Sequence, residues 1–246
     1  MWVRNVIFES ISNKFHLRFR DRTNAGNILA SALNDKIKKD ERPYSIVLGI
    51  PRGGVVVADI VANKLSCHFD IVIPRKLGAP HNEEVAIGAV MEDGTTYLNE
   101  EIVRILEVSK EYIEKEKAKQ IQEIKRRTSL YRGSQSYELS NMKNIVLVDD
   151  GAATGATIIA AARWIRRRRT LQKQKPGHHN IGNRLIIAIP VAANDTVDLF
   201  KKEADHVEVI ITPSTYSFRS VGQYYQSFEQ VEDEQVMQII KSRGLL

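Results

Sequence analysis

The chain has 246 residues, of which 43% are hydrophobic and 27% are charged, and its formal net charge is +6. These proportions are ordinary for a folded globular protein and exclude the disordered, collagen-like and coiled-coil classes. The longest unbroken apolar run has nine residues, 185–193, whereas a membrane helix needs about 20, so we expect no membrane span.

Segments with strand character alternate with segments of helical periodicity along the chain. Residues 25–33 have helical apolar spacing after the possible N-caps Asp21 and Thr23. Short apolar runs predict strands at 45–50, 69–73, 145–148, 185–190 and 207–211. Further helices are predicted at 55–65, 157–167, 195–202 and around 236–240. Near-continuous apolar strands separated by helices indicate an α/β fold with a parallel sheet covered on both faces.

The middle of the chain departs from this alternation. Residues 87–91 and 95–98 predict a hairpin, and two helices follow at 100–106 and 110–127. The helix at 110–127 is mostly polar, carries favourable i,i+4 pairs such as Glu123–Arg127, and has a thin apolar stripe. We expect it to project from the body as a lid or a subunit-contact arm.

The positive charge is concentrated in one region. Residues 163–184 contain eight basic side chains and no acid, so the rest of the chain sums to −2. A globally basic nucleic-acid binder would differ from this pattern. The cluster Arg163–Lys175 is either the solvated end of a helix or a contact for nucleic acid or a subunit, and we favour the solvated end.

The cysteine content indicates a reducing compartment. Cys67 is the single cysteine and cannot form an internal disulfide, so we expect a cytoplasmic protein. We interpret Cys67 as a small core residue. The first nine residues contain no apolar stretch of signal-peptide length.

The stretch 145–157 carries the clearest chemical signal. An apolar strand runs into Asp149 and Asp150, and a loop of small residues and threonines then opens a helix. Small residues let backbone N–H groups approach a phosphate, and a helix N-terminus favours an anion. The two carboxylates suit neutral hydroxyls or a hydrated Mg²⁺. A sugar phosphate offers hydroxyls to the two carboxylates and a phosphate to the loop and the helix N-terminus. It would lie at the carboxyl end of a parallel strand, where such folds bind ligands.

The sequence Val-Leu-Val-Asp-Asp-Gly-Ala-Ala-Thr-Gly-Ala-Thr, 146–157, resembles the signature for phosphoribosyl pyrophosphate (PRPP) in type I phosphoribosyltransferases. It is not a mononucleotide P-loop, because no Gly-Lys-Ser/Thr follows. The resemblance implies the type I phosphoribosyltransferase fold in a single domain, 1–246. That fold has a mostly parallel central sheet flanked by helices, a lid or arm insertion at about 79–140 and a small hood at about 212–230.

Other stretches extend this resemblance. Residues 49–54, Gly-Ile-Pro-Arg-Gly-Gly, resemble the family's pyrophosphate loop, which commonly carries a cis peptide. Arg75-Lys76 resembles the basic pair that meets the diphosphate, and 79–131 occupies the place of the flexible catalytic loop. The whole chain is also similar to an uncharacterised subgroup of phosphoribosyltransferases through stretches such as Phe-Arg-Asp-Arg-Thr-Asn-Ala-Gly at 19–26.

The resemblance implies a role for each matching residue. The implied catalytic residues are Asp149, Asp150, Lys76 and Glu84. Asp149 and Asp150 would meet the ribose hydroxyls, directly or through Mg²⁺-bound water, and Mg²⁺ is the implied cofactor. The residues implied to bind PRPP are Arg52, Gly53, Gly54, Arg75, Lys76, Asp149, Asp150, Gly151, Ala152, Ala153, Thr154, Gly155, Ala156 and Thr157.

The sequence does not identify the acceptor of the phosphoribosyl group. Ala153 stands where 6-oxopurine enzymes of the family have an aspartate, which argues against hypoxanthine, guanine and xanthine. Phe218, Tyr224 and Tyr225 either stack on a flat base or form the core of the hood. Glu83 and Glu84 are candidates to orient the nucleophile, or they are a surface pair.

Three functions are compatible with these features. The first is a Mg²⁺-dependent transferase that moves the phosphoribosyl group of PRPP to a nucleobase or similar nitrogen nucleophile and releases pyrophosphate. The second is a PRPP-sensing regulator that contacts nucleic acid through the basic cluster, and the third is a binding protein without transfer activity. We favour the transferase, expect no nucleic-acid partner, and expect a homodimer because the family often dimerises.

Overall fold

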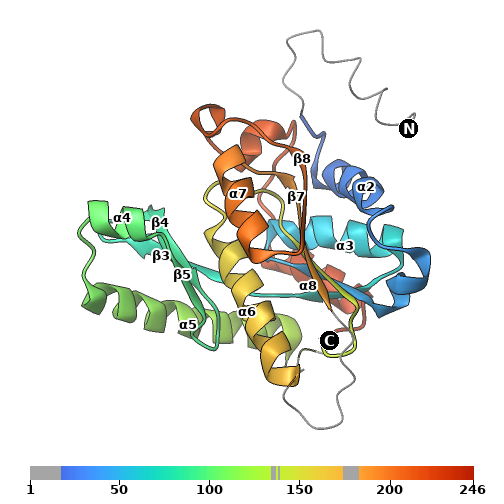
Figure 1. The fold of residues 1–246 in the computed structure, drawn as a ribbon, viewed down its shortest axis with the longest axis horizontal. Helices are drawn as coiled ribbons and strands as arrows, with labels where there is room; N and C mark the ends of the chain where they lie inside the picture. Colours follow the sequence, from blue (N-terminus) through green and yellow to red (C-terminus); the bar gives the residue numbers. More distant parts are fainter. Residues whose placement is uncertain (1–17, 134–136, 138, 174–182) are drawn as a thin grey trace.

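The computed structural model describes residues 18–133, 137, 139–173 and 183–246. Its centre is a five-stranded parallel sheet with the strand order β2-β1-β6-β7-β8 (Figure 1). The strands are β1 (Ser45–Gly49), β2 (His68–Ile71), β6 (Asn144–Val148), β7 (Arg184–Val191) and β8 (His206–Ile211). The predicted α/β class is confirmed, and each of the five predicted strands is present.

Helices cover both faces of this sheet (Figure 1). One face carries α2 (Arg22–Leu33), α3 (Gly53–Leu65) and α8 (Asp233–Ser242), and the other carries α6 (Ala156–Lys173) and α7 (Asn194–Glu203). A short 3₁₀ helix, η2 (Lys39–Tyr44), leads into β1. Side chains alternate along each strand, so Val47 and Leu48 enter different cores, and both are fully buried.

Helix α2 begins where the sequence predicted. The Asp21 side chain accepts a hydrogen bond of 2.7 Å from the backbone N–H of Asn24, which satisfies a free donor of the first turn. Because Arg22 is the first residue of α2, this cap also fixes the backbone position of Arg22.

A second sheet and two helices form an arm beside the central sheet (Figure 1). Its strands β3 (Arg75–Ala79), β4 (Asn82–Val90) and β5 (Thr96–Leu98) are antiparallel. The helices are α4 (Glu100–Ile105) and α5 (Lys110–Arg132). The predicted hairpin and helices are confirmed, whereas β3 was missed: the Arg75-Lys76 pair, expected to close a strand, begins one. The segment 79–131 is accordingly built of strands and helices rather than of one long loop.

The polar helix α5 is fixed to the body at its C-terminal end. Arg132 forms an ion pair of 2.6 Å with Asp70 at the end of β2, and the two side chains are 3% and 8% exposed. The ring of Tyr137 lies 3.6 Å from the Arg132 guanidinium carbon. The i,i+4 ion pair predicted between Glu123 and Arg127 is present at 2.7 Å.

The arginine cluster on α6 is largely paired within the chain. Arg163 and Arg169 contact Glu203 and Asp205, which come from the neighbouring α7 region. The Arg168 guanidinium lies over the ring of Trp164, 4.4 Å from its centroid. From the sequence we favoured a solvated helix end, whereas in the structure these arginines have partners within the chain. Lys175 lies outside the described residues.

Cys67 is buried, and burial raises the pKa of its thiol to about 11, so the core interpretation is confirmed. Within the described ranges, no helix has both the length and the apolar character needed to cross a bilayer.

Candidate active site

The acidic pair lies where β6 ends, at the carboxyl edge of the parallel sheet. Asp149 and Asp150 are both half-buried, and the backbone N–H of Asp150 donates to Asp149 Oδ1 at 2.8 Å. Burial raises the pKa of both carboxyls, and the nearby Asp150 carboxylate raises that of Asp149 further. Two carboxylates with poor hydration favour a ligand that supplies hydroxyl donors or a cation.

Arg22 is a site residue that sequence reasoning missed. Its Nε atom lies 2.8 Å from Asp150 Oδ2, and this contact lowers the pKa of Asp150 against the effect of burial. Arg22 and Asp150 are 128 positions apart. Arg22 lies in the stretch 19–26, which carries part of the resemblance to the uncharacterised subgroup, and this resemblance is the signal in the sequence that points to it.

The loop at 50–54 packs directly against the acidic pair. A Cβ atom on Gly53 would lie 1.8 Å from Asp150 Oδ2, and one on Gly54 would lie 2.7 Å from Asp149 Oδ1. Glycine is therefore required at both positions for the close approach. The peptide bond between Pro51 and Arg52 is cis, as the resemblance to the pyrophosphate loop implied.

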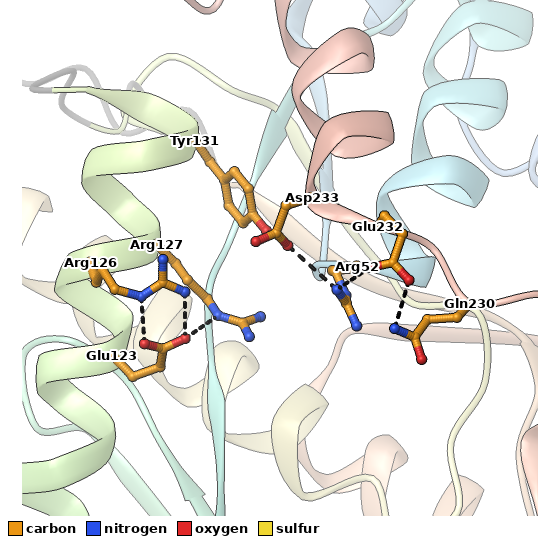
Figure 2. Close-up of polar contacts among 8 residues, drawn as sticks. All are labelled: Arg52, Glu123, Arg126, Arg127, Tyr131, Gln230, Glu232 and Asp233. Carbon is orange, nitrogen blue, oxygen red and sulfur yellow. Dashed lines mark hydrogen bonds and ion pairs between the residues drawn. The ribbon is translucent and has the colours of Figure 1, made fainter.

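Arg52 turns toward α8 and the end of α5 (Figure 2). Its Nη1 atom lies 3.1 Å from Glu232 Oε2 and 3.6 Å from Asp233 Oδ1. The Tyr131 hydroxyl donates to the same Asp233 oxygen at 2.5 Å. Arg127 of α5, paired with Glu123, extends toward Arg52 in this view. Arg52 is therefore held by carboxylates that an anionic ligand would have to replace.

The loop 151–157 connects the acidic pair to α6. The N–H of Ala152 donates to the carbonyl of Val191 at 2.9 Å, and the Thr196 hydroxyl donates to the carbonyl of Ala153 at 2.5 Å. These bonds hold the loop against β7 and α7. Thr154 is exposed, Thr157 is half-buried, and α6 begins at Ala156. The first N–H groups of a helix lack intrahelical partners, so this end suits a phosphate.

The basic pair Arg75-Lys76 does not act as one unit in the structure. Neighbouring side chains on a strand point to opposite faces. Arg75 Nε donates to Gln120 Oε1 of α5 at 2.9 Å, and it lines a pocket of about 430 Å³ with side chains of that helix. Burial lowers the pKa of Arg75, and Arg127 lowers it further. Lys76 Nζ lies 3.6 Å from Glu84 Oε2 of β4.

The two glutamates follow the turn between β3 and β4. Glu83 pairs with Lys119 of α5 at 3.0 Å, and Glu84 contacts Lys76. Both carboxylates are exposed, with 78% and 94% of the side chain accessible. Glu84 therefore lies beside Lys76. Among the described residues, neither glutamate contacts Asp149 or Asp150.

The hood contains the short 3₁₀ helices η3 (Thr215–Ser217) and η4 (Val221–Tyr224). Tyr224 and Tyr225 are 7% and 3% exposed and belong to one apolar cluster with Phe19. The Tyr225 hydroxyl donates to the backbone carbonyl of Asp150 at 2.6 Å, and burial raises its pKa. A base stacks only on an accessible ring, so the structure favours the hood-core alternative for both tyrosines. Phe218 is half-buried.

The carboxylates of the site suit a hydrated Mg²⁺ better than a metal chelated by the protein alone. The described ranges contain no cluster of three or more His, Cys, Asp or Glu side chains that would chelate a metal unaided. Asp149 and Asp150 carry two carboxylates, and Arg22 compensates one of them. Mg²⁺ keeps several waters and typically needs only one or two carboxylates together with substrate phosphates, so the pair fits a hydrated Mg²⁺ carried by a phosphate ligand.

Comparisons with known proteins identify the family of the chain. The family model described as "Phosphoribosyl transferase domain" matches residues 20–210. "Putative phosphoribosyl transferase Rv0571c" of Mycobacterium tuberculosis H37Rv is 36% identical over 219 residues, which are 89% of this chain and 45% of that protein. The chain therefore spans about half the length of this curated relative. The crystal structure of TT1426 from Thermus thermophilus is 36% identical, with a TM-score of 0.66 over 92% of this chain and 98% of that chain.

Proposed function

Because the chain belongs to the phosphoribosyltransferase family, we propose that it transfers the 5-phosphoribosyl group of PRPP to a nitrogen nucleophile and releases pyrophosphate. The observation that supports this most is the close approach of Gly53 and Gly54 to Asp150 and Asp149 at one sheet edge. The loop 151–157 leads from this acidic pair into α6, whose first N–H groups lack intrahelical partners. These elements supply acceptors for hydroxyls and donors for two phosphate groups.

Each element has a part in the proposed reaction. Asp149 and Asp150 accept from the ribose hydroxyls, and 151–157 holds the 5′-phosphate. Arg52, Gly53 and Gly54 face the diphosphate, and one member of the Arg75-Lys76 pair does so as well, because the two side chains point to opposite faces of β3. As the nitrogen forms its bond to the anomeric carbon, the bond to the diphosphate oxygen breaks, and the diphosphate leaves with both electrons of that bond. The nucleophile's proton passes to Glu84 or to solvent. Catalysis is then mainly positioning and charge stabilisation.

Mg²⁺ is part of the proposal, with Asp149 and Asp150 as the residues that would hold it through water. When bound, it would neutralise charge on the leaving diphosphate. The chain's own residues supply the rest: Arg52 exchanges its contacts with Glu232 and Asp233 for phosphate oxygens.

The acceptor is proposed only as a class. Ala153 is exposed at the loop and offers no carboxylate, which favours an acceptor other than a 6-oxopurine. Of the three aromatic candidates, Phe218 is the one with an accessible surface. We also propose a homodimer in a reducing cytoplasm. Ile105 at the end of the arm is 67% exposed, which suits contact with a second copy, and a monomer in light scattering would contradict the dimer.

The regulator is the weaker candidate. It needs free cations to meet nucleic acid, whereas Arg163 and Arg169 have acidic partners within the chain. Steeply salt-dependent binding of an oligonucleotide would favour it.

Calorimetry with PRPP and Mg²⁺ tests the proposal. The wild type should bind PRPP and should bind ribose 5-phosphate more weakly, because the diphosphate contacts are lost. The double variant Asp149→Asn/Asp150→Asn keeps the shape of both side chains and should lose affinity for PRPP. Equal affinity of wild type and variant would contradict the assigned role of the acidic pair.

A further inference from the structure

The acidic pair has a cationic neighbour from the beginning of the described chain. Arg22 stands on the first turn of α2, with Nε 2.8 Å from Asp150 Oδ2. The two side chains are 12% and 15% exposed. An ion pair that is so far removed from water is directional and poorly screened, unlike an ion pair on an open surface.

The same guanidinium reaches the hood through a different nitrogen. Arg22 Nη1 donates to the backbone carbonyl of Glu229 at 2.7 Å, and the guanidinium carbon lies 3.9 Å from the centroid of the Phe228 ring. A planar guanidinium with several fixed donors can make these contacts at once, whereas a lysine ammonium cannot reproduce them. Arg22 therefore joins α2, the acidic pair and the hood.

We propose that Arg22 is a positioning residue: it holds the Asp150 carboxylate in one orientation beside the Gly53-Gly54 loop and ties that orientation to the hood at Phe228 and Glu229. This inference rests on the proposed function, in which Asp150 accepts from the ribose of PRPP. Gly53 supports it, because a Cβ atom there would lie 1.8 Å from Asp150 Oδ2 and 2.9 Å from Arg22 Nε. The loop, the carboxylate and the guanidinium thus leave one another little freedom.

The first experiment uses the protein without ligand. Chemical denaturation of the wild type, Arg22→Gln, Asp150→Asn and the double variant measures the coupling between the two side chains, and Arg20→Gln combined with Asp150→Asn gives the control cycle. Arg20 is exposed and lies two residues away, and its contacts involve the backbone. Arg22→Gln should destabilise the wild type and should cost much less in the Asp150→Asn background, whereas Arg20→Gln should show no coupling to Asp150. An equal loss of stability in both backgrounds, or the same coupling in the control cycle, would overturn the inference.

The second experiment measures PRPP affinity with Mg²⁺ in the same variants. Arg22→Gln should weaken binding by roughly tenfold or more, the effect of losing one charge-assisted hydrogen bond. Arg22→Lys keeps the charge but loses the planar set of donors, so its affinity should fall as well. It also serves as the second variant if Arg22→Gln does not fold. Wild-type affinity in Arg22→Lys would overturn the positioning role. Failure of the wild type to bind PRPP would instead contradict the proposed function, and the coupling measured by denaturation would then decide the ion-pair role of Arg22.

Discussion

Replacing Gly53 by alanine tests the contact between the glycine loop and the acidic pair. The added Cβ atom would lie 1.8 Å from Asp150 Oδ2 and 2.6 Å from Asp150 Cγ, whereas favourable separations between non-bonded heavy atoms are about 3.5 Å or more. The Asp150 side chain must therefore move, and its 2.8 Å contact with Arg22 breaks. Overpacking of this kind costs about 1–3 kcal/mol of the free energy of unfolding.

The Asp150 side chain decides whether Gly53→Ala lowers or raises the free energy of unfolding. Gly53 has no positive φ and opens α3, so without the clash an alanine there should stabilise the protein by about 0.4–1 kcal/mol. We expect Gly53→Ala to destabilise the wild type and to be neutral or stabilising in Asp150→Ala. Chemical denaturation of the four proteins in this double-mutant cycle measures the difference. The same loss of stability in both backgrounds would refute the assigned contact.

Two further predictions concern stability. Arg132→Leu leaves the Asp70 carboxylate buried without its ion-pair partner and should lower the free energy of unfolding by about 3–5 kcal/mol in chemical denaturation. The control Arg126→Leu removes an exposed pair of the same helix and should cost less than about 1 kcal/mol. Equal losses in the two variants would contradict the role given to Arg132. Asp149→Asn should be more stable than the wild type at pH 7, because a carboxyl whose pKa is raised by burial and by Asp150 loses its stabilising contribution as the pH rises through that pKa. This advantage should vanish below the ordinary pKa of aspartate, about 4, and an advantage of the same size at low pH would contradict the reasoning.

Local patterns in the sequence were sufficient for the central sheet. The apolar runs at 45–50 and 145–148 became β1 and β6, because a buried parallel strand needs apolar side chains on both faces. The resemblance to the PRPP signature and to the pyrophosphate loop implied that the acidic pair and the glycine loop belong to one site. The carboxyl ends of neighbouring parallel strands meet at one sheet edge, and β1 and β6 are neighbours.

Side-chain partners that are distant in the sequence could not be predicted in this way. Arg22 and Asp150 meet only because α2 passes the end of β6. Glu203 neutralises Arg163 only because α7 lies beside α6, so the basic cluster looked less compensated in the sequence than it is in the fold. Strand β3 was missed because Arg75 and Lys76 begin it, and two charged residues do not indicate a strand.

The hood illustrates a different limit. An aromatic residue on a loop is equally consistent with base stacking and with burial, and the sequence does not distinguish the two. The structure buries Tyr225, where its hydroxyl bonds to the backbone of Asp150. The hood therefore holds the backbone of Asp150 through Tyr225. It also contacts Arg22, the partner of the Asp150 carboxylate, through the carbonyl of Glu229.

The most direct test of the account is the release of pyrophosphate from PRPP in the presence of Mg²⁺ and a panel of nucleobases, offered singly. The account predicts release that depends on one acceptor and that is lost in Asp149→Asn/Asp150→Asn, while Arg20→Gln retains it. The acceptor should be other than hypoxanthine, guanine or xanthine. Release that is unaffected by the double substitution would contradict the role of the acidic pair. Binding of PRPP without release, for every base in the panel, would contradict transfer to a nucleobase.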